Sequence, residues 1–312
     1  MLTIDMIRQA KDRIAPYIYE TPLLRIPVLD DQLGCQVYVK CENMQKTNAF
    51  KLRGAINRLL TLSKEDLAKG VITASSGNHG KATAYAAKCL GLKACVVVPN
   101  TIPKIKLDGI RGYDAEVIFA IPSERTAVAK SIRDERECTF ISPYDDYEIM
   151  AGQGTIGLEI MEQLSDVDTL VIPIGGGGLI GGISTSIKEM NPNIRVIGVE
   201  PTNTCRYTKS FAAGKRVKLS SDSTSVADGA GTLIPGEKNF PIVQKNVDEI
   251  VTVDEEYILK GTKLMLNSGK ILIETTSGLV IGAVLQSKLK FHSEEKVVFL
   301  LSGGNIAMDG FI

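Results

Sequence analysis

Nine short runs of β-branched and other apolar residues recur along the chain, and patterns typical of helices lie between most of them. The runs are VYVK at 37–40, VITAS at 71–75, ACVVVP at 94–99, AEVIFA at 115–120, TFIS at 139–142, LVIPI at 170–174, RVIGVE at 195–200, EIVTV at 249–253 and VVFLL at 297–301. Strands that alternate with helices form parallel sheets with helices on both faces. The sequence therefore predicts an α/β fold built on open, twisted parallel sheets.

The number and spacing of these strands predict two domains. Nine strands are many for one open sheet in a chain of 312 residues. Four closely spaced strand–helix units predict a small α/β domain at 70–145. The flanking segments, 1–69 and 146–312, would then form one larger, discontinuous domain.

Charge, cysteine content and apolar patterning exclude several classes of protein. Lys plus Arg equals Asp plus Glu at 36 each, so bulk charge attracts neither nucleic acid nor anionic lipid. No apolar run approaches the roughly 18 to 20 residues that cross a bilayer, and the N-terminus lacks a signal-peptide core. The six cysteines include no CxxC pair, so the sequence indicates neither a zinc site nor a redox motif. Scattered thiols of this kind suit a reducing cytosol. We expect a cytoplasmic protein that contacts neither membrane nor nucleic acid.

The first unusual strand end is SSGNHG at 75–80, which follows the run VITA. Ligands of open parallel sheets bind at the carboxyl ends of strands, where helices begin. Free N–H groups and the helix dipole favour an anion at such a position. A single Ser or Asn here would be read as a helix cap, but the six residues together favour a binding role.

The second is IGGGGLIGG at 174–182, which follows LVIP. Consecutive glycines let the backbone approach a phosphate closely and present several N–H donors. The motif GxxxxGK[ST] is absent from the chain, so the anion is expected to be a single phosphomonoester. GQGTIG at 152–157 fits GxGxxG, but no strand precedes it, and a dinucleotide site is therefore excluded.

Two further motifs complete the set: SGGN at 302–305 after a buried strand, and NAFKLRGA at 48–55 at the start of a helical pattern. In their chain order of NAFKLRGA, SSGNHG, IGGGGLIGG and SGGN, the four motifs resemble those of fold-type II pyridoxal-phosphate (PLP) enzymes, specifically the serine racemase and serine/threonine dehydratase group. TPLL at 21–24, KCEN at 40–43, AGQGT at 151–155, GVEP at 198–201 and ADG at 227–229 extend the resemblance over nearly the whole chain. It implies a fold like that of the tryptophan synthase β subunit, with PLP in the cleft between two domains, and a homodimer.

The resemblance also assigns roles to individual residues. It implies that Lys51 forms the Schiff base with PLP and then serves as the base on one face of the substrate. The implied cofactor contacts are Phe50 beside the ring, Asn78 at the phenolic oxygen, Ser302 at the pyridine nitrogen, a phosphate cradle of Gly175, Gly176, Gly177 and Gly178, and Leu179 behind it. The implied substrate contacts are Ser75, Ser76, Asn78, His79, Arg125 and Thr232.

The implied reaction is α,β-elimination, which converts L-serine, L-threonine or 3-hydroxyaspartate to a 2-keto acid and ammonia. PLP acidifies the Cα–H of the amino acid bound to it. A neutral serine at the ring nitrogen makes the ring a weaker electron sink and favours loss of a β-leaving group. The alternative is a serine racemase with elimination as a side reaction. In that case the Ser76 hydroxyl would return a proton to the face of the substrate opposite Lys51. Binding of the substrate carboxylate is an equally good reading of Ser76, and a β-replacement transferase ranks below both reactions.

Two positions depart from the racemase pattern. Racemase-like relatives bind a divalent metal through a glutamate and an aspartate six residues later, whereas here Glu200 is followed at that distance by Arg206. One carboxylate does not make the oxygen cage of Mg²⁺ or Ca²⁺, so we expect no bound metal and a pairing of Arg206 with Glu200. Tyr144 stands where racemase-like relatives carry asparagine. Glu274, in ILIETTSG, is expected to be buried near the site, with no role assigned.

Overall fold

The computed structural model of the chain describes residues 1–75 and 77–306. Within these residues the strands form two sheets. The strands of the larger sheet are β1 (Leu23–Arg25), β2 (Gln36–Cys41), β7 (Thr169–Pro173), β8 (Arg195–Pro201), β9 (Glu249–Val253) and β10 (Lys296–Leu301). Those of the smaller sheet are β3 (Val71–Ala74), β4 (Ala94–Pro99), β5 (Glu116–Ala120) and β6 (Thr139–Phe140).

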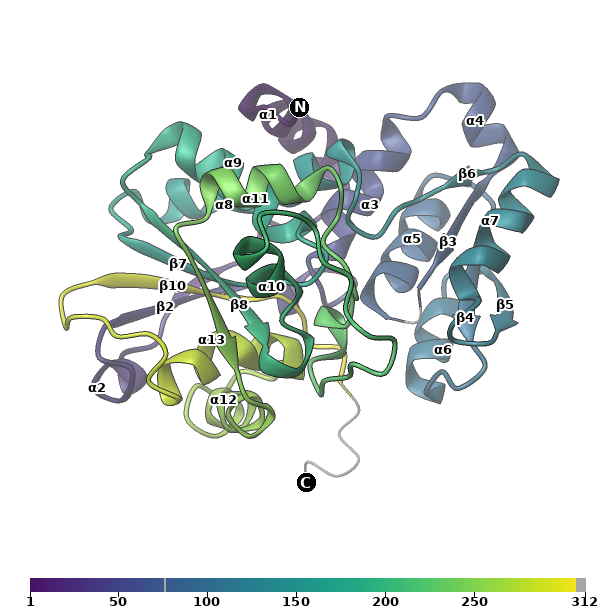
Figure 1. Cartoon of the computed structure of the whole chain (residues 1–312). Helices are drawn as coiled ribbons and strands as arrows, with labels where there is room; N and C mark the ends of the chain where they lie inside the picture. The colour runs from purple at the N-terminus through teal and green to yellow at the C-terminus, as the bar shows by residue number, and fades with distance from the viewer. Residues whose placement is uncertain (76, 307–312) are drawn as a thin grey trace.

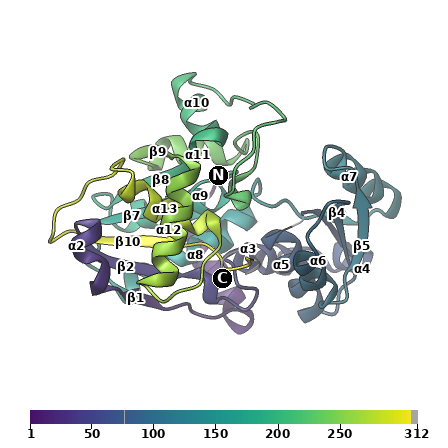
Figure 2. The same ribbon diagram turned by 90° about the horizontal axis from the view of Figure 1, so that it is seen from below.

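The larger sheet has the order β1-β2-β10-β7-β8-β9, and the smaller has the order β5-β4-β3-β6. Every pairing is parallel except that of β1 with β2. The two sheets lie side by side with their helices around them (Figures 1 and 2). The prediction of two parallel-sheet α/β domains is therefore confirmed, while the exact boundaries at 69/70 and 145/146 stay a prediction.

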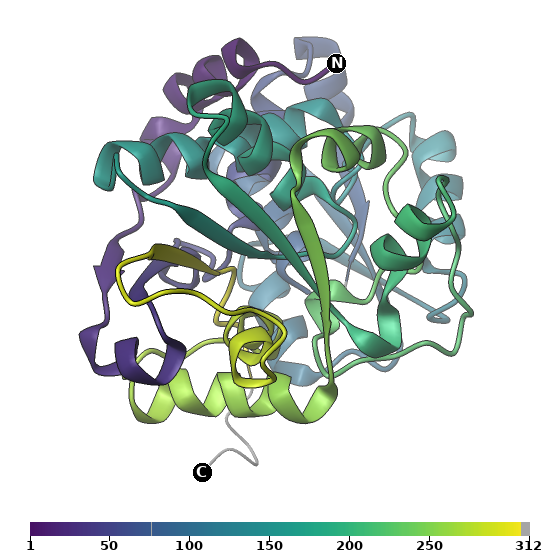
Figure 3. The same ribbon diagram turned by 60° about the vertical axis from the view of Figure 1, so that its left-hand side comes forward.

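Helices cover both faces of each sheet. In chain order they are α1 (Ile4–Ile14), α2 (Asp30–Leu33), α3 (Lys51–Leu60), α4 (Lys64–Lys69), α5 (Asn78–Cys89), α6 (Lys104–Arg111), α7 (Arg125–Arg136), α8 (Tyr147–Gln163), α9 (Gly178–Met190), α10 (Arg206–Ala212), α11 (Asn239–Asn246), α12 (Glu255–Asn267) and α13 (Thr275–Leu285). On the larger sheet α12 and α13 cover one face, and α8, α9 and α11 cover the other (Figure 3). On the smaller sheet α7 packs on one face, and α5 and α6 pack on the other.

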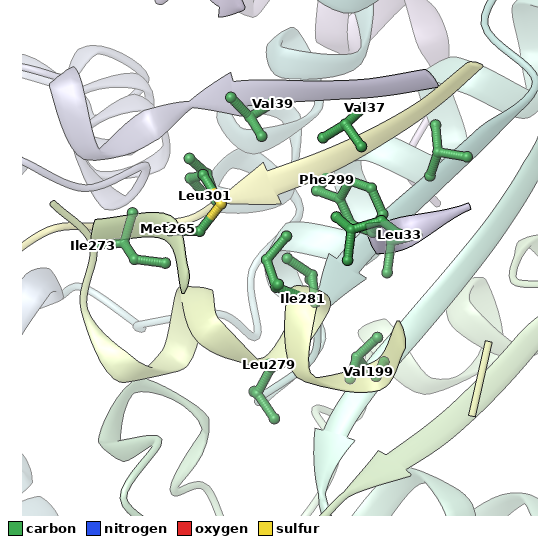
Figure 4. Close-up of a cluster of buried hydrophobic side chains, with 14 of the residues drawn as sticks. Leu33, Val37, Val39, Val199, Met265, Ile273, Leu279, Ile281, Phe299 and Leu301 are labelled. Carbon is green, nitrogen blue, oxygen red and sulfur yellow. The ribbon is translucent and has the colours of Figure 1, made fainter. Parts of the chain in front are cut away.

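Strand β10 shows how the sequence produces this arrangement. Val297, Phe299 and Leu301 point into the core under α13, whereas Val298 and Leu300 point toward the core under α8 and α9. Successive side chains of a strand alternate between faces, so a strand covered on both sides reads as a continuous apolar run. Figure 4 shows Phe299 and Leu301 of β10 beside labelled side chains of α13.

Two details of the prediction are tested by the fold. Residues 152–157, the GxGxxG match, lie inside helix α8 and not in a strand–helix turn, which agrees with the exclusion of a dinucleotide site. Strand β1 was missed, because its three residues carry no alternating pattern and it adds to an edge in antiparallel fashion.

None of the helices among the described residues has both the length and the apolar character needed to span a membrane.

Candidate active site

Lys51 is the first residue of α3, and the end of β10 fixes its position. Phe50 N–H donates to the Ser302 carbonyl at 3.1 Å, and Ala49 forms an isolated bridge with Gly303. The Lys51 ammonium donates to the carbonyl of Pro143 at 2.6 Å and lies 5.0 Å from the centre of the Phe50 ring. Burial lowers the pKa of Lys51 to about 8, against a weaker opposing effect of Glu274. A neutral amine is therefore accessible near physiological pH.

A cavity of about 370 Å³ lies beside Lys51. It is lined by residues of the half that contains the larger sheet and of the half that contains the smaller sheet. The predicted residues along it are Phe50, Lys51, Ser75, Asn78, His79, Arg125, Gly176, Thr232 and Ser302. The remaining predicted residues, Gly175, Gly177, Gly178 and Leu179, line an adjoining recess of about 30 Å³ that shares Phe50, Lys51 and Ser302. Ser76 lies outside the described residues. The motifs, spread from 50 to 302 in sequence, thus converge on one place.

Ser75 follows the last residue of β3, and Asn78, His79 and Gly80 of the same motif form the start of α5, as its composition predicts. Asn78 begins the helix, and its Nδ2 donates to both carboxylate oxygens of Glu274 at 2.9 Å. The Asn78 Oδ1 accepts from Asn305 Nδ2 at 2.8 Å. Asn78 is therefore held rigidly between two parts of the larger half, with its side chain on the cavity wall.

His79 is buried and neutral. Its Nε2 lies 3.2 Å from the Ile141 carbonyl; because a carbonyl only accepts, Nε2 carries the proton. Burial, and next the charge of Lys51, lower the pKa of His79 to about 3. Its Nδ1 is buried without a hydrogen-bond partner among the described residues. His79 consequently presents an acceptor, and not a positive charge, at the helix start.

The glycine run joins β7 to α9, and hydrogen-bond donors of neighbouring segments fix its position. The Gly176 carbonyl accepts from Tyr207 Oη at 3.0 Å, from Asn239 Nδ2 at 2.9 Å and from the Gly236 amide at 3.0 Å. A Cβ on Gly176 would lie 2.3 Å from the Tyr144 ring, and Gly177 has a φ of 99°. Side chains are excluded here, which leaves the loop amides and the N-terminus of α9 facing the recess.

Ser302 leaves β10 almost completely buried, and its Oγ lies 3.2 Å from Ser277 Oγ. Ser277 Oγ in turn donates to the Gly303 carbonyl at 2.9 Å. A neutral hydroxyl is thus fixed on the wall that the cavity and the recess share. Thr232 Oγ1 is buried without a hydrogen-bond partner in the described part of the chain, and burial lowers the pKa of Arg125.

The sequence did not single out Lys106, Asp228 and Thr276 as site residues, yet they also line the cavity. Asp228 belongs to the ADG motif, which offered a signal, whereas Lys106 is one charged residue on an amphipathic helix. The Lys106 ammonium pairs with the Asp228 carboxylate, and this contact joins α6 to the short helix η5 (Asp228–Ala230). Glu274 lies on the same wall, and burial raises its pKa to about 7.

The divalent metal of racemase-like relatives does not fit this chain. Among the described residues no group of three or more His, Cys, Asp or Glu side chains is arranged to hold a metal ion. Glu200 accepts hydrogen bonds from the start of α10, and the Arg206 guanidinium fills the neighbouring space. The expected direct pairing was wrong in its detail: within the described residues the two side chains form neither a hydrogen bond nor an ion pair and interact through space.

The residues do fit pyridoxal phosphate. A phosphate requires backbone donors without side-chain obstruction, and the glycine loop at the α9 N-terminus supplies them. A ring aldehyde requires a buried amine that deprotonates near neutral pH, and Lys51 meets this condition. A ring nitrogen requires a polar partner, and Ser302 lies on the shared wall between the loop and Lys51.

Comparisons with known proteins identify the family of this chain. The serine racemase of Dictyostelium discoideum is 39% identical over 309 residues, which cover 98% of this chain and 95% of that protein. An L-threonine ammonia-lyase of Geobacter sulfurreducens is 41% identical over 308 residues, covering 98% of this chain and 76% of that protein. The structure of maize serine racemase superposes with a TM-score of 0.95 at 35% identity and covers 99% of this chain and 95% of that one. The family model described as pyridoxal-phosphate dependent enzyme matches residues 14–303, and the chain belongs to that family.

Proposed function

We propose that the protein is a PLP-dependent ammonia-lyase that converts L-serine or L-threonine to a 2-keto acid and ammonia. The observation that carries this proposal is the position of Lys51, a buried amine whose pKa is about 8. It lies at the junction of a cavity large enough for an amino acid and a recess lined by the glycine loop. The relatives named above include an L-threonine ammonia-lyase, which supports the same activity.

Lys51 is the proposed point of covalent attachment for the cofactor. The amides of the glycine loop and the N-terminus of α9 would hold the phosphate, with Leu179, the second residue of α9, behind them. Phe50 would pack beside the ring, Ser302 Oγ would pair with the ring nitrogen and the Asn78 amide would bind the phenolic oxygen. Pyridoxal phosphate, when bound, supplies the electron-accepting ring that acidifies the Cα–H of an attached amino acid.

The start of α5 is the proposed site for the substrate carboxylate. Ser75 and Asn78 offer hydroxyl and amide donors there, and the helix dipole adds to their effect. Ser76, which follows Ser75 in the sequence, is a further proposed contact of the carboxylate. His79 is neutral, so we expect it to shape this site and to accept a hydrogen bond, not to neutralise the carboxylate. Arg125 and Thr232 also line the cavity, and we expect them to contact the substrate.

The proton at the substrate Cα is the proposed target of Lys51. Its amine becomes available once the substrate has displaced it, and it then lies next to the carbon that it deprotonates. Ser302 is a neutral partner for the ring nitrogen and does not stabilise charge on the ring as a carboxylate would. A neutral partner at this position would favour loss of the β-hydroxyl, and therefore elimination, over accumulation of negative charge.

Racemisation of serine is the second candidate. The chain is closely similar to serine racemases, and Ser76 supplies a hydroxyl in the segment that enters α5. In this reading Ser76 returns a proton to the face opposite Lys51 and inverts the centre. The two activities are compatible in one site, because both begin with removal of the same proton.

Product analysis separates the two activities. The enzyme is incubated with PLP and L-serine or L-threonine, and pyruvate, 2-oxobutyrate and D-serine are quantified in the same reactions. Keto acid without D-serine identifies an ammonia-lyase, and D-serine in excess of pyruvate identifies a racemase. Lys51→Ala is expected to abolish both products, whereas Lys64→Ala, which changes the exposed first residue of α4, is expected to change neither. Absence of all three products with the wild type would contradict the proposal.

We also expect a homodimer. Size-exclusion chromatography with light scattering checks this expectation, and a mass near the 33.7 kDa of one chain would contradict it.

A further inference from the structure

Arg206 is a fully buried arginine, and its three hydrogen bonds within the described residues all go to main-chain carbonyl oxygens. Nη1 donates to the Ile174 carbonyl at 3.1 Å. Nη2 donates to the Ala230 carbonyl at 2.5 Å and to the Thr204 carbonyl. A buried guanidinium normally pairs with carboxylates, so this set of partners calls for a physical explanation.

Arg53 gives the contrast within the same molecule. It is equally buried, and Nε and Nη2 donate to Glu42 while Nη1 and Nη2 donate to Glu159. That arrangement is an ordinary buried ion-pair network. Arg206 instead binds neutral oxygens from two distant segments and from the turn just before its own helix, as a bound cation does.

Two of the three carbonyls, those of Ile174 and Ala230, belong to segments that form the proposed cofactor site. Ile174 directly precedes the glycine run, and Ala230 ends η5, whose neighbours line the cavity. Thr204 ends the short helix η4 (Thr202–Thr204) before α10. The first two segments touch, since a Cβ on Gly175 would lie 3.1 Å from the Gly229 carbonyl. One guanidinium therefore fixes their relative position.

Two neighbours of Arg206 complete the arrangement. Tyr207 follows it in α10 and donates from Oη to the Gly176 carbonyl, so consecutive residues hold both ends of the same loop segment. Glu200 is the penultimate residue of β8, and its carboxylate accepts from the amides of Tyr207 and Thr208 at 3.1 and 2.7 Å and from Thr208 Oγ1 at 2.7 Å. Burial raises the pKa of Glu200, and the nearby charge of Arg206 opposes that effect.

Carbonyl oxygens together with one carboxylate are the ligand types that Mg²⁺ and Ca²⁺ prefer. We infer that the Arg206 guanidinium is a built-in cation that takes the place of a divalent metal and positions the glycine loop against the 228–232 segment. The inference rests on the proposed role of this loop as the phosphate site. It makes the cofactor site of this chain independent of divalent cations, unlike the sites of metal-binding relatives.

The test compares the wild-type holoenzyme with Arg206→Lys, Arg206→Met and Arg206→Asp in EDTA and in millimolar Mg²⁺ or Ca²⁺. Two quantities are measured: the melting temperature, and the dissociation constant of PLP from its change in absorbance. Arg195→Met and Arg195→Asp are the matched controls, because Arg195 lies on the same strand as Glu200 but forms a partly exposed pair with Glu249.

The wild type and both controls are expected to give the same values in EDTA and in either cation. Arg206→Met and Arg206→Lys are expected to bind PLP about tenfold more weakly or worse, because buried carbonyls lose their donors and one ammonium does not span all three. Arg206→Asp is expected to be weakened most in EDTA and to regain melting temperature and PLP affinity when Mg²⁺ or Ca²⁺ is added.

Three results would overturn the inference. One is a wild type that loses stability or PLP affinity in EDTA and recovers both with the cation. Another is unchanged PLP affinity in Arg206→Met and Arg206→Lys. The third is an Arg206→Asp protein that no cation restores, whether it folds or not. If the wild type bound no PLP, the result would contradict the proposed function and not this inference. The melting temperature of the wild type in EDTA would still test the role of Arg206.

Discussion

Both carboxylate oxygens of Glu274 accept hydrogen bonds from the Asn78 amide nitrogen at 2.9 Å. Asn78 begins α5 of the smaller half, and Glu274 precedes α13 of the larger half. The Glu274 amide also donates to the Gly303 carbonyl at 2.9 Å, next to Ser302. A buried carboxyl therefore connects the proposed carboxylate site with the proposed ring-nitrogen site, and its protonation state affects both.

Glu274→Gln is expected to change how stability depends on pH. Burial raises the folded-state pKa from 4.5 to about 7, so the folded wild type binds a proton more tightly than the unfolded chain. Stability from this group is present below pH 4.5 and is lost as pH rises toward 7. The loss is about 3 kcal/mol. The variant lacks this titration, so its stability relative to the wild type should rise between pH 4.5 and 7.

Urea unfolding at several pH values measures this difference. Glu249→Gln, on the partly exposed strand β9, serves as the control and should show no comparable trend. A difference between Glu274→Gln and wild type that stays constant from pH 4.5 to 8 would contradict the raised pKa.

Covalent capture of PLP by the apoenzyme is expected to report the pKa of Lys51. Only the neutral amine attacks an aldehyde, and a pKa of about 8 leaves about a tenth of the amine neutral at pH 7. The capture rate should therefore rise with pH and level off above about 8, whereas an unperturbed lysine would continue to gain rate toward pH 10. Stopped-flow absorbance follows the reaction, and Lys51→Ala should show no covalent phase. A rate that is still rising at pH 9.5 in the wild type would refute the burial effect.

The sequence predicted the parts of the site that consist of backbone chemistry. Local sequence pattern alone locates glycine runs and helix starts that directly follow apolar strands. The glycine loop at residues 175–178 and the start of α5 were located in this way. Contacts between distant segments carry no such signal. The Lys106–Asp228 pair and the link from Asn78 to Glu274 depend on how the two sheets pack, and two of the three carbonyls at Arg206 come from distant segments of the larger half. The antiparallel strand β1 was missed for a related reason, since only its neighbour β2 defines it.

Lys106→Met is expected to weaken substrate binding without removing the chemistry. The Lys106–Asp228 pair joins α6 to η5 across the cavity wall, and its side chains are 24% and 55% exposed. A pair this accessible contributes about 1 kcal/mol or less. The KM for L-serine should therefore rise up to about fivefold with little change in kcat, and the effect should shrink in high salt.

The control is Lys104→Met, which breaks the exposed pair of Lys104 with Asp108 on the same helix. It should leave KM unchanged. An equal rise in KM for both variants would show that the effect comes from helix α6 in general and not from the contact with Asp228.

Gly176→Ala is expected to abolish PLP binding by collision with one side chain. The new Cβ would lie 2.3 Å from the Tyr144 ring, which packs against the glycine loop, so either the ring or the loop must move. Combining Gly176→Ala with Tyr144→Ala removes the obstructing ring and should restore part of the PLP affinity lost in the single variant. Gly109→Ala in α6 is the control, because its Cβ would meet only the Lys81 side chain at ordinary distances of 3.7 and 3.8 Å. PLP titration measures the affinity of the wild type, Gly176→Ala, the double variant and Gly109→Ala. If the double variant binds no better than Gly176→Ala alone, the requirement for glycine lies in the phosphate contact itself and not in Tyr144.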